Sequence, residues 1–303
     1  MSTKYCPICE IQLFAPYRDA LLDYEYRTPY CVDLIRCEGC GLVRQREVPG
    51  YDRLGLFYPS DYLAHNANFA SKNNPLFAFL KRVLYSRKAN AVARLIGRKG
   101  RVLDVGCANG AFLQHLNALG NFDLHGLDIK DPGIDFAAKS ISFHRGPLET
   151  AQYAEGFFDA VNMDNVIEHV PDPIRFLNDV RLLLKPGGYV FGSTPNHNSW
   201  DRGLFGKYWG GYHMPRHIYL FNACNFELLL EKTGFRRVCY PVTANAADWA
   251  VSLQNFLQRK KVKTRPYTRT LYFPLVGMAM APLAIMASFL RRNGVMDFIA
   301  RKA

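Results

Sequence analysis

The chain has 303 residues, of which 49% are hydrophobic and 14% aromatic, and its formal net charge is +12. This composition excludes a disordered chain and allows one large core plus a small accessory module. The first ten residues are polar and lack the apolar stretch of a secretory signal, which predicts a cytoplasmic protein. Eight cysteines in that reducing compartment favour metal ligands or buried thiols over disulfides.

Two Cys-x-x-Cys pairs mark the N-terminal region, residues 1–60. Cys6 and Cys9 form the first pair, and Cys37 and Cys40 form the second. Each pair can turn back on itself and present two thiolates to one tetrahedral ion, so the spacing predicts a zinc ribbon. Four thiolates would complete the coordination of Zn²⁺, and we therefore expect a structural rather than a catalytic ion. The alternative is four unrelated cysteines.

The middle of the chain alternates between predicted helices and strands. In residues 61–98, expected to form a helical linker that covers the cofactor site, apolar side chains recur at helical spacing over 75–97. Short apolar runs then predict strands at 101–106, 124–128, 141–144, 157–163 and 188–193. Helices are expected between them, at 111–119 and 174–184. This alternation predicts an α/β fold whose parallel sheet is covered on both faces, with a ligand at the carboxyl ends of the strands.

The turn after the first of these strands carries the most information. Gly106 and Gly110 lie in the segment Val102-Leu-Asp-Val-Gly-Cys-Ala-Asn-Gly110, and Asp128 ends the next strand, where a carboxylate can hold ribose hydroxyls. The G-x-x-x-G spacing differs from the G-x-G-x-x-G of dinucleotide dehydrogenases. Asp104 is placed to orient an ammonium group. We therefore expect a nucleoside with an amino-acid end rather than a pyrophosphate.

Together with three later segments, this turn resembles class I S-adenosylmethionine (SAM)-dependent methyltransferases. The later segments are Phe158-Asp-Ala-Val161, Ile167-Glu-His-Val-Pro-Asp172 and Leu184-Lys-Pro-Gly-Gly188. The resemblance implies a Rossmann-like seven-stranded sheet of order 3-2-1-4-5-7-6, with the last strand antiparallel, and a SAM-dependent methyltransferase domain over residues 99–303. Ala108 departs from the family pattern, which has a second glycine there.

The resemblance also implies which residues bind SAM: Asp104, Gly106, Cys107, Gly110, Asp128, Ile129, Leu148, Glu149, Met163 and Asp164. In this interpretation, Gly106 and Cys107 offer backbone to the methionine end and Asp128 holds the ribose. The adenine lies against residue 129 and beside residues 148–149, and residues 163–164 line the floor near the sulfonium.

The N-terminal region resembles a module found before methyltransferases of bacterial glycan and natural-product sugar pathways. Residues 36–43 and 57–62 carry this likeness. By that likeness, Tyr58 or Tyr62 reaches over the cofactor; the alternative is that both tyrosines pack between modules.

Candidate catalytic groups follow the fourth and fifth strands. Methyl transfer needs an aligned acceptor and a group that removes its proton. We expect His217 as the base, His213 as the second candidate and Arg216 as an anchor for an anion or the substrate. His169, after strand four, is more often a positioning element in this family. The alternative for His217 is that it caps or packs a helix start.

Two flanking segments bear on the acceptor. Residues 200–212 are rich in aromatic residues and glycine and are predicted to form a substrate loop. Residues 193–196 read Ser-Thr-Pro-Asn, and the Asn-Pro-Pro-Tyr signature of methylation at the amino groups of bases is absent, which favours an oxygen or carbon acceptor.

The segment 244–292 is predicted to be a basic, apolar helical insertion before the last strand, 295–300. Residues 270–290 carry no charge, yet from Arg259 onward the chain has ten Lys or Arg residues and one acidic residue. Prolines, a glycine and the return to the last strand oppose a membrane span. Two alternatives remain: peripheral contact of 259–292 with the inner face of the membrane, or a lid over the active site.

Three functions fit these observations. The first is O-methylation of a sugar, a lipid-linked glycan or another small acceptor, with sugar C-methylation as a variant. The second is RNA methylation, with the zinc ribbon and basic tail gripping nucleic acid. It is less favoured because the charge lies beside an apolar segment. The third, a non-catalytic SAM-binding module, is disfavoured by the intact cofactor motif.

Overall fold

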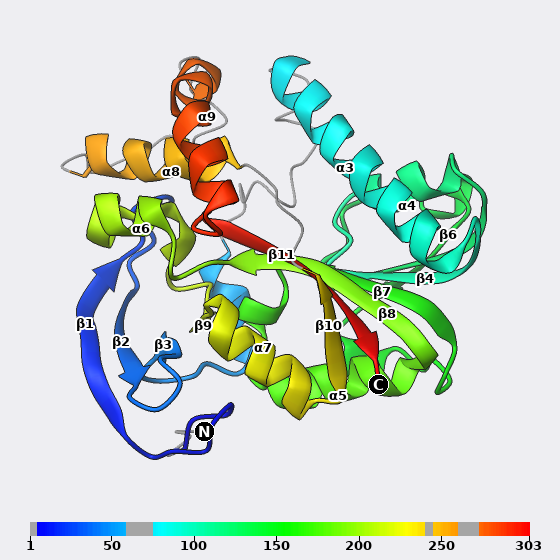
Figure 1. Ribbon diagram of the computed structural model, residues 1–303, viewed down its shortest axis with the longest axis horizontal. Helices are drawn as coiled ribbons and strands as arrows, with labels where there is room; N and C mark the ends of the chain where they lie inside the picture. The colour runs from blue at the N-terminus through cyan, green and yellow to red at the C-terminus, as the bar shows by residue number, and fades with distance from the viewer. Residues whose placement is uncertain (1–4, 59–74, 240–244, 260–272) are drawn as a thin grey trace.

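The computed structural model describes residues 5–58, 75–239, 245–259 and 273–303. A seven-stranded sheet runs through the centre in the order β10-β11-β8-β7-β4-β5-β6 (Figure 1). Its strands are β4 (Lys99–Val105), β5 (Asn121–Asp128), β6 (Ile141–Arg145), β7 (Phe158–Asp164), β8 (Leu184–Pro195), β10 (Phe235–Cys239) and β11 (Val295–Lys302). From β6 to β10 this is the predicted order 3-2-1-4-5-7-6, and β11 is antiparallel to both neighbours. The fold prediction is confirmed.

Alternate residues of the central strands face two separate layers of helices. Val102 and Ala160 pack against α3 (Pro75–Ile96) and α4 (Ala111–Asn117). Their sequence neighbours Leu103 and Val161 pack on the opposite side, against α5 (Pro173–Leu183) and α7 (Ala223–Lys232). Strands buried on both faces are apolar throughout, which is why short continuous apolar runs located them in the sequence.

The N-terminal module forms three strands of a second, four-stranded sheet. Its order is β1 (Phe14–Leu22), β2 (Cys31–Cys37), β3 (Val43–Gln45) and β9 (Tyr219–Leu220). The short helices α1 (Tyr51–Leu54) and η1 (Gly55–Phe57) follow it. Because β9 comes from the methyltransferase part of the chain, the two parts share one sheet and are joined by backbone hydrogen bonds.

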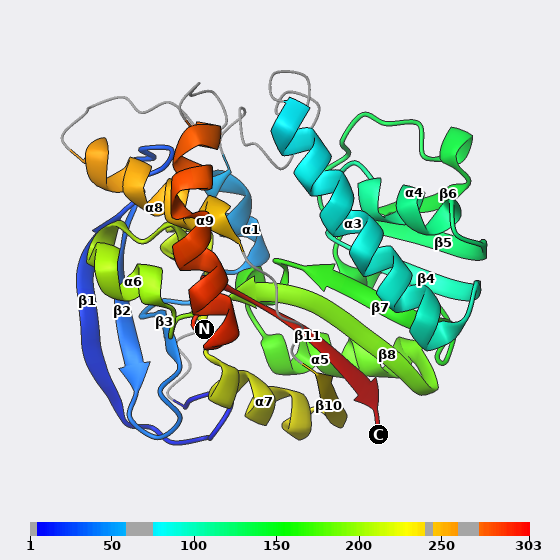
Figure 2. The ribbon, with the colours of Figure 1, turned by 45° about the horizontal axis from the view of Figure 1, so that its top comes forward.

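Two helices form the insertion between β10 and β11. These are α8 (Ala246–Leu257) and α9 (Phe273–Phe289), and they pack together through Trp249, Ala284 and Ala287 (Figure 2). Most of the basic run 259–265 lies outside the described residues. In the described part of the chain, no helix is both long enough and apolar enough to cross a bilayer.

Short helical segments complete the fold and carry several site residues: η2 (Ala137–Lys139), η3 (Leu148–Thr150), η4 (Ile167–His169), α6 (Trp200–Phe205), η5 (Gly206–Tyr208) and η6 (Gly210–Tyr212).

Candidate active site

A cavity of about 570 Å³ opens at the carboxyl ends of β4, β5 and β7. The lining includes the turn after β4 and the residues that follow β5. It also includes residues of the N-terminal module, three histidines and residues of α8, and we call the part with the histidines and α8 the acceptor end. The cavity therefore lies at the edge of the sheet where ligands of open α/β folds bind.

The turn after β4 needs glycine at its first position. Gly106 has a φ of +71°, and an added Cβ would lie 2.8 Å from Val166. The amides of Gly106 and Cys107 donate to the carbonyl of Leu127, which fixes the turn against β5. Ala108 also takes a left-handed φ, +46°, at the position where the family has glycine. The left-handed region costs a non-glycine residue about 1–2 kcal/mol, so this departure stores strain beside the cofactor site.

Asp128 lies at the end of β5 with its carboxylate oriented by backbone. Its Oδ2 accepts from the amide of Ala108 and its Oδ1 from the amide of Lys130, both at 3.0 Å. Ile129 follows, 59% exposed, and lines the same part of the cavity as Leu148. A carboxylate beside two apolar side chains fits a ribose with an adenine next to it.

Two more carboxyl groups lie deeper, beneath the turn. Asp104 accepts from the side-chain amide of Asn162, and Asp164 accepts from Lys88 and from Ser193 Oγ. Burial raises the pKa of Asp104 to about 7, the hydrogen bond from Asn162 opposes this, and the charge of Asp164 adds to it. A ligand ammonium here would favour the ionised carboxylate. The site therefore suits the cationic amino-acid end of SAM.

Binding of SAM is expected to depend on the protonation of Asp104. Its pKa of about 7 means that lowering the pH protonates the carboxylate and removes the attraction for an ammonium group. Affinity measured by calorimetry should be about tenfold weaker at about pH 6 than at about pH 8. Asp104→Asn should bind more weakly and lose this pH dependence. An unchanged pH dependence in the variant would contradict the assignment.

Three residues predicted to contact SAM do not line the cavity: Gly110, Glu149 and Met163. Side chains alternate along β7, so Asn162 and Asp164 face the cavity while Met163 is buried in the core on the other face. Gly110 immediately precedes α4 with a φ of +68°, and an added Cβ would lie 2.8 Å from Phe136. Glycine is therefore needed at this position for local packing and not for contact with the cavity. Predicting Met163 as a floor residue was wrong, and Asn162 takes that place.

His169 and His217 lie together at the acceptor end of the cavity, with ring centroids 4.6 Å apart. Nδ1 of His217 is 2.9 Å from the carbonyl oxygen of Gly211, and Nδ1 of His169 is 3.0 Å from that of Arg216. A carbonyl only accepts, so each Nδ1 carries the proton and each Nε2 keeps a lone pair. Burial lowers the pKa of His169 to about 4 and that of His217 well below its ordinary value, so both rings are neutral near pH 7.

The N-terminal module supplies another part of the cavity wall. Glu25, from the loop between β1 and β2, lies with Oε2 2.6 Å from Nδ1 of His213. Tyr58 lines the cavity and its hydroxyl is 3.1 Å from Nδ1 of His169. The expectation that Tyr58 reaches into the site agrees with this placement. Tyr62 lies outside the described residues.

Arg216 does not lie in the cavity. Its side chain is fully buried, and its guanidinium donates to both carboxylate oxygens of Asp23 at 3.0 and 3.1 Å and to the carbonyl of Phe57. The predicted role as a substrate anchor does not fit this placement. Arg216 instead joins the methyltransferase part of the chain to the N-terminal module.

The predicted substrate loop, residues 200–212, presents backbone rather than rings. Trp209 and Tyr212 are buried in the core beneath the small sheet, and the Trp209 indole donates to Asp201. Gly210 and Gly211 line the cavity. The glycines of this segment therefore line the cavity, and the buried rings of Trp209 and Tyr212 hold the segment in place.

Helix α8 closes the acceptor end. Asp248 and Val251 line the cavity, and burial raises the pKa of Asp248 well above its ordinary value. This placement supports the lid alternative for α8, whereas no described residue of α9 lines the cavity.

The four cysteines of the two pairs come together away from the cavity. Sγ of Cys6 lies 3.5 Å from Sγ of Cys40, and Sγ of Cys9 lies 3.4 Å from that of Cys37. All four sulfurs lie within 4.8 Å of one another and could hold a metal ion. Tetrahedral Zn²⁺ with bonds of about 2.3 Å needs sulfurs roughly 3.8 Å apart, so the cluster fits zinc.

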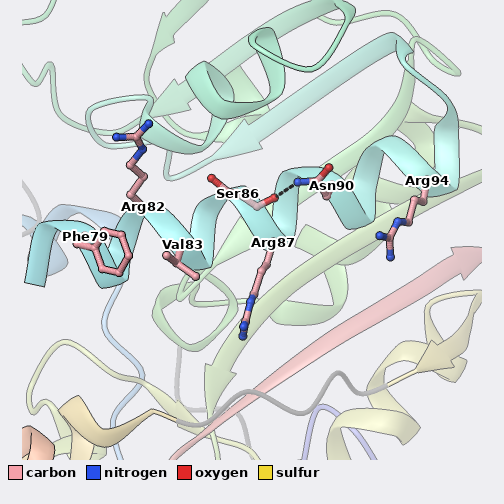
Figure 3. Close-up of a pocket in the computed structure, with 7 residues that line it drawn as sticks. All are labelled: Phe79, Arg82, Val83, Ser86, Arg87, Asn90 and Arg94. Carbon is pink, nitrogen blue, oxygen red and sulfur yellow. Dashed lines mark hydrogen bonds between the residues drawn. The ribbon is translucent and has the colours of Figure 1, made fainter. Parts of the chain in front are cut away.

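A second hollow follows one side of α3 and is lined by Phe79, Arg82, Val83, Ser86, Arg87, Asn90 and Arg94 (Figure 3). Asn90 donates to the carbonyl of Ser86 within the helix. Since one helix supplies the entire lining, this hollow is a basic helix face separate from the cofactor site.

Comparison with known proteins identifies the family. A family model described as a methyltransferase domain matches residues 77–240, more than half of the chain. The chain belongs to this methyltransferase family. The match spans the turn after β4, Asp128 and the three histidines, and the chain is a SAM-dependent methyltransferase.

Curated relatives include ubiquinone biosynthesis O-methyltransferases. That of Paraburkholderia phymatum is 29% identical over 163 residues, which cover 50% of this chain and 68% of the relative. That of Acinetobacter baylyi is 35% identical over 113 residues, which cover 34% of this chain and 46% of the relative. The chain therefore spans about half the length of the Acinetobacter protein.

Solved structures show the shared fold. The 1,6-didemethyltoxoflavin-N1-methyltransferase of Burkholderia thailandensis is 13% identical with a TM-score of 0.50, covering 95% of this chain and 99% of that one. A candidate sarcosine dimethylglycine methyltransferase from Galdieria sulphuraria is 13% identical with a TM-score of 0.51, covering 74% and 86%.

Proposed function

We propose that this methyltransferase methylates a hydroxyl oxygen of a small acceptor, such as a sugar or a lipid-linked glycan. One observation carries the proposal: the cofactor turn and two neutral histidines, His169 and His217, line a single cavity. Relatives named as O-methyltransferases support oxygen as the accepting atom. The resemblance of the N-terminal module supports a sugar.

The chain's own residues bind, orient and deprotonate. SAM supplies a methyl group on a sulfonium. Asp128 holds the ribose, and Asp104 orients the amino-acid end. At the acceptor end, Nε2 of His217 accepts the acceptor's hydroxyl proton while the Gly211 carbonyl keeps the ring in the required tautomer. Such base catalysis contributes about 10²–10⁴-fold.

The side chains that line the cavity favour a small neutral acceptor over RNA. The described lining includes five carboxyl side chains and one Lys or Arg, Lys130; the carboxyl groups belong to Glu25, Asp104, Asp128, Asp164 and Asp248. Burial raises the pKa of Glu25 to about 8 and that of Asp248 well above its ordinary value, so these two groups are largely uncharged near neutral pH. A phosphodiester backbone needs Lys and Arg to replace its counterions, and a described lining with one Lys therefore disfavours the RNA alternative.

Transfer of labelled methyl from SAM tests the proposal. The substrates would be a lipid-linked sugar, a free glycoside, a phenol and an unmodified RNA, with the methylated atom located by NMR. We expect label on a hydroxyl oxygen of one of the first three. Label in RNA, or on carbon, would replace the proposal with the corresponding alternative.

We also propose that Cys6, Cys9, Cys37 and Cys40 bind a structural Zn²⁺. With four thiolates the coordination is complete, so the ion would stabilise the N-terminal module. Glu25 and Tyr58 belong to that module and line the cavity. By stabilising the module, the ion would therefore help to hold these two side chains in the cavity wall.

A membrane surface is the partner that we propose for α9. Apolar side chains of this helix are exposed from Leu275 to Phe289: Leu275, Met278, Leu283, Ile285, Met286 and Phe289. Arg291 and Arg292 are exposed at its end. In Figures 1 and 2 the first turns of α3 and α9 lie at the same end of the molecule, and Phe79 and Arg82 are exposed on α3. Apolar side chains edged by arginine fit an anionic lipid interface.

The protein is expected to float with vesicles of anionic lipid at low salt. Met278→Asp with Phe289→Asp should weaken binding more than tenfold, since each large apolar side chain contributes roughly 1.5–3 kcal/mol on burial. Leu204→Asp is the control, because Leu204 is 67% exposed on α6. Absence of flotation, or a dimer that the double variant dissociates, would contradict a lipid partner.

A further inference from the structure

Three side chains face one another at the acceptor end of the cavity. Glu168 and His169 come from η4, and His217 comes from the segment before β9. One potential ligand atom from each lies within 4.8 Å of the other two, and Glu168 Oε1 is 3.9 Å from Nε2 of His217. His169 and His217 also line the cavity.

The hydrogen bonds around this cluster leave its inward atoms available. Both imidazoles use Nδ1–H on backbone carbonyls, those of Arg216 and Gly211. Metal-bound histidines have this arrangement, in which the other ring nitrogen donates to a carbonyl or carboxylate and fixes the ring. In this tautomer the Nε2 atom of each ring keeps a lone pair that can bind a metal ion.

Glu168 supplies the second, independent observation. Its side chain is fully buried; Oε2 accepts from Thr194, whereas Oε1 has no hydrogen-bond partner among the described residues. A buried carboxyl oxygen without a hydrogen-bond partner costs free energy. A cation between Oε1 and the two imidazoles would remove that cost.

We propose that Glu168, His169 and His217 bind a divalent first-row transition-metal ion. Two imidazoles and one carboxylate suit Zn²⁺, Mn²⁺ or Fe²⁺, whereas Mg²⁺ and Ca²⁺ prefer oxygen ligands throughout. A tetrahedral ion with bonds of about 2.1 Å needs ligand atoms roughly 3.4 Å apart.

Three protein ligands leave a coordination position for the acceptor, as in catalytic zinc sites. This use of the ion rests on the proposed O-methylation. A hydroxyl bound there becomes more acidic and releases its proton to water. The oxygen then bonds to the methyl carbon as the carbon–sulfur bond breaks and its electron pair stays on sulfur. His217 acts in this arrangement as a ligand, and the ion takes over activation of the hydroxyl.

Binding of Mn²⁺ to the full chain, with the four-cysteine cluster loaded with Zn²⁺, tests the site. Mn²⁺ binds weakly to all-thiolate sites, so it should not replace Zn²⁺ in the four-cysteine cluster. The concentration of free Mn²⁺ is measured by electron paramagnetic resonance. We expect one Mn²⁺ per chain. Glu168→Gln and His217→Gln should weaken binding at least tenfold. His144→Gln is the control, since His144 lies on β6 and bonds to Thr150 outside the cavity, and it should bind as the parent does.

Each variant is first checked for folding by circular dichroism and for binding of S-adenosylhomocysteine. Failure of the parent chain to bind Mn²⁺ or a second Zn²⁺ would overturn the proposal. Binding that survives in both cluster variants would overturn it equally. Metal binding is measured without any methyl transfer. A missing metal site is therefore distinguished from a failure of the proposed O-methylation.

Discussion

Replacing His217 with alanine is expected to lower turnover about 10²–10⁴-fold while leaving binding of S-adenosylhomocysteine nearly unchanged. The reason is that the ring of His217 contacts His169 and the carbonyl of Gly211. Its Nε2 lone pair faces Glu168, and no backbone group of the cofactor turn bonds to its ring. In either proposed role, as a base or as a metal ligand, His217 would act on the acceptor oxygen and not on the cofactor.

The measurement pairs turnover with calorimetry of the demethylated cofactor. His144→Ala is the control, because His144 lies on β6 and bonds to Thr150 outside the cavity. If cofactor affinity collapses in His217→Ala while turnover per bound cofactor holds, the histidine belongs to the cofactor site.

Local sequence signals predicted that Gly106 and Asp128 lie in one site, and both residues line the same cavity. Gly106 and Asp128 follow two consecutive buried strands, and the carboxyl ends of adjacent parallel strands meet at one edge of the sheet. The family resemblance placed Met163 on the cavity floor, because the resemblance did not specify which residues of β7 face the cavity. Asn162 lies two residues before Asp164 and shares its face, so counting alternate residues back from that aspartate would have found it.

The acceptor end could be predicted only in part, because it depends on contacts between distant segments. His213 and His217 were found as a histidine-rich cluster. Glu25 reaches His213 across 188 residues, and Asp23 reaches Arg216 across 193. No local sequence pattern predicts pairs between residues so far apart in the chain. Arg216 therefore resembled a substrate anchor in the sequence, although its partner lies in the N-terminal module.

These contacts make the N-terminal module part of the active site. The loop between β1 and β2 holds both Asp23, which pairs with Arg216, and Glu25, which lines the cavity. Asp23 also accepts from the amides of Glu25 and Tyr26 and so shapes the loop. Loosening this loop should therefore affect folding and acceptor binding together.

Asp23→Ala is expected to lower the free energy of unfolding by about 3–5 kcal/mol, because it leaves the Arg216 guanidinium buried without its carboxylate. The side chains of Arg216 and Asp23 are 0% and 1% exposed. Burial alone would raise the pKa of Asp23, but the adjacent Arg216 charge holds it below its ordinary value. A lowered pKa means that this stabilisation is present at neutral pH and is lost as the pH falls through the titration of Asp23.

Urea unfolding of the parent, of Asp23→Ala and of Asp19→Ala measures the effect. Asp19 pairs with Arg46 at 3.7 Å, and these side chains are 73% and 48% exposed, so its loss should cost less than about 1 kcal/mol. The double variant Asp23→Leu with Arg216→Met removes both charges and should be more stable than Asp23→Ala, because no buried charge is left unpaired. If the double variant is the less stable of the two, the Asp23 loop acts through its backbone contacts and the buried charge pair is not what joins the module to the methyltransferase fold.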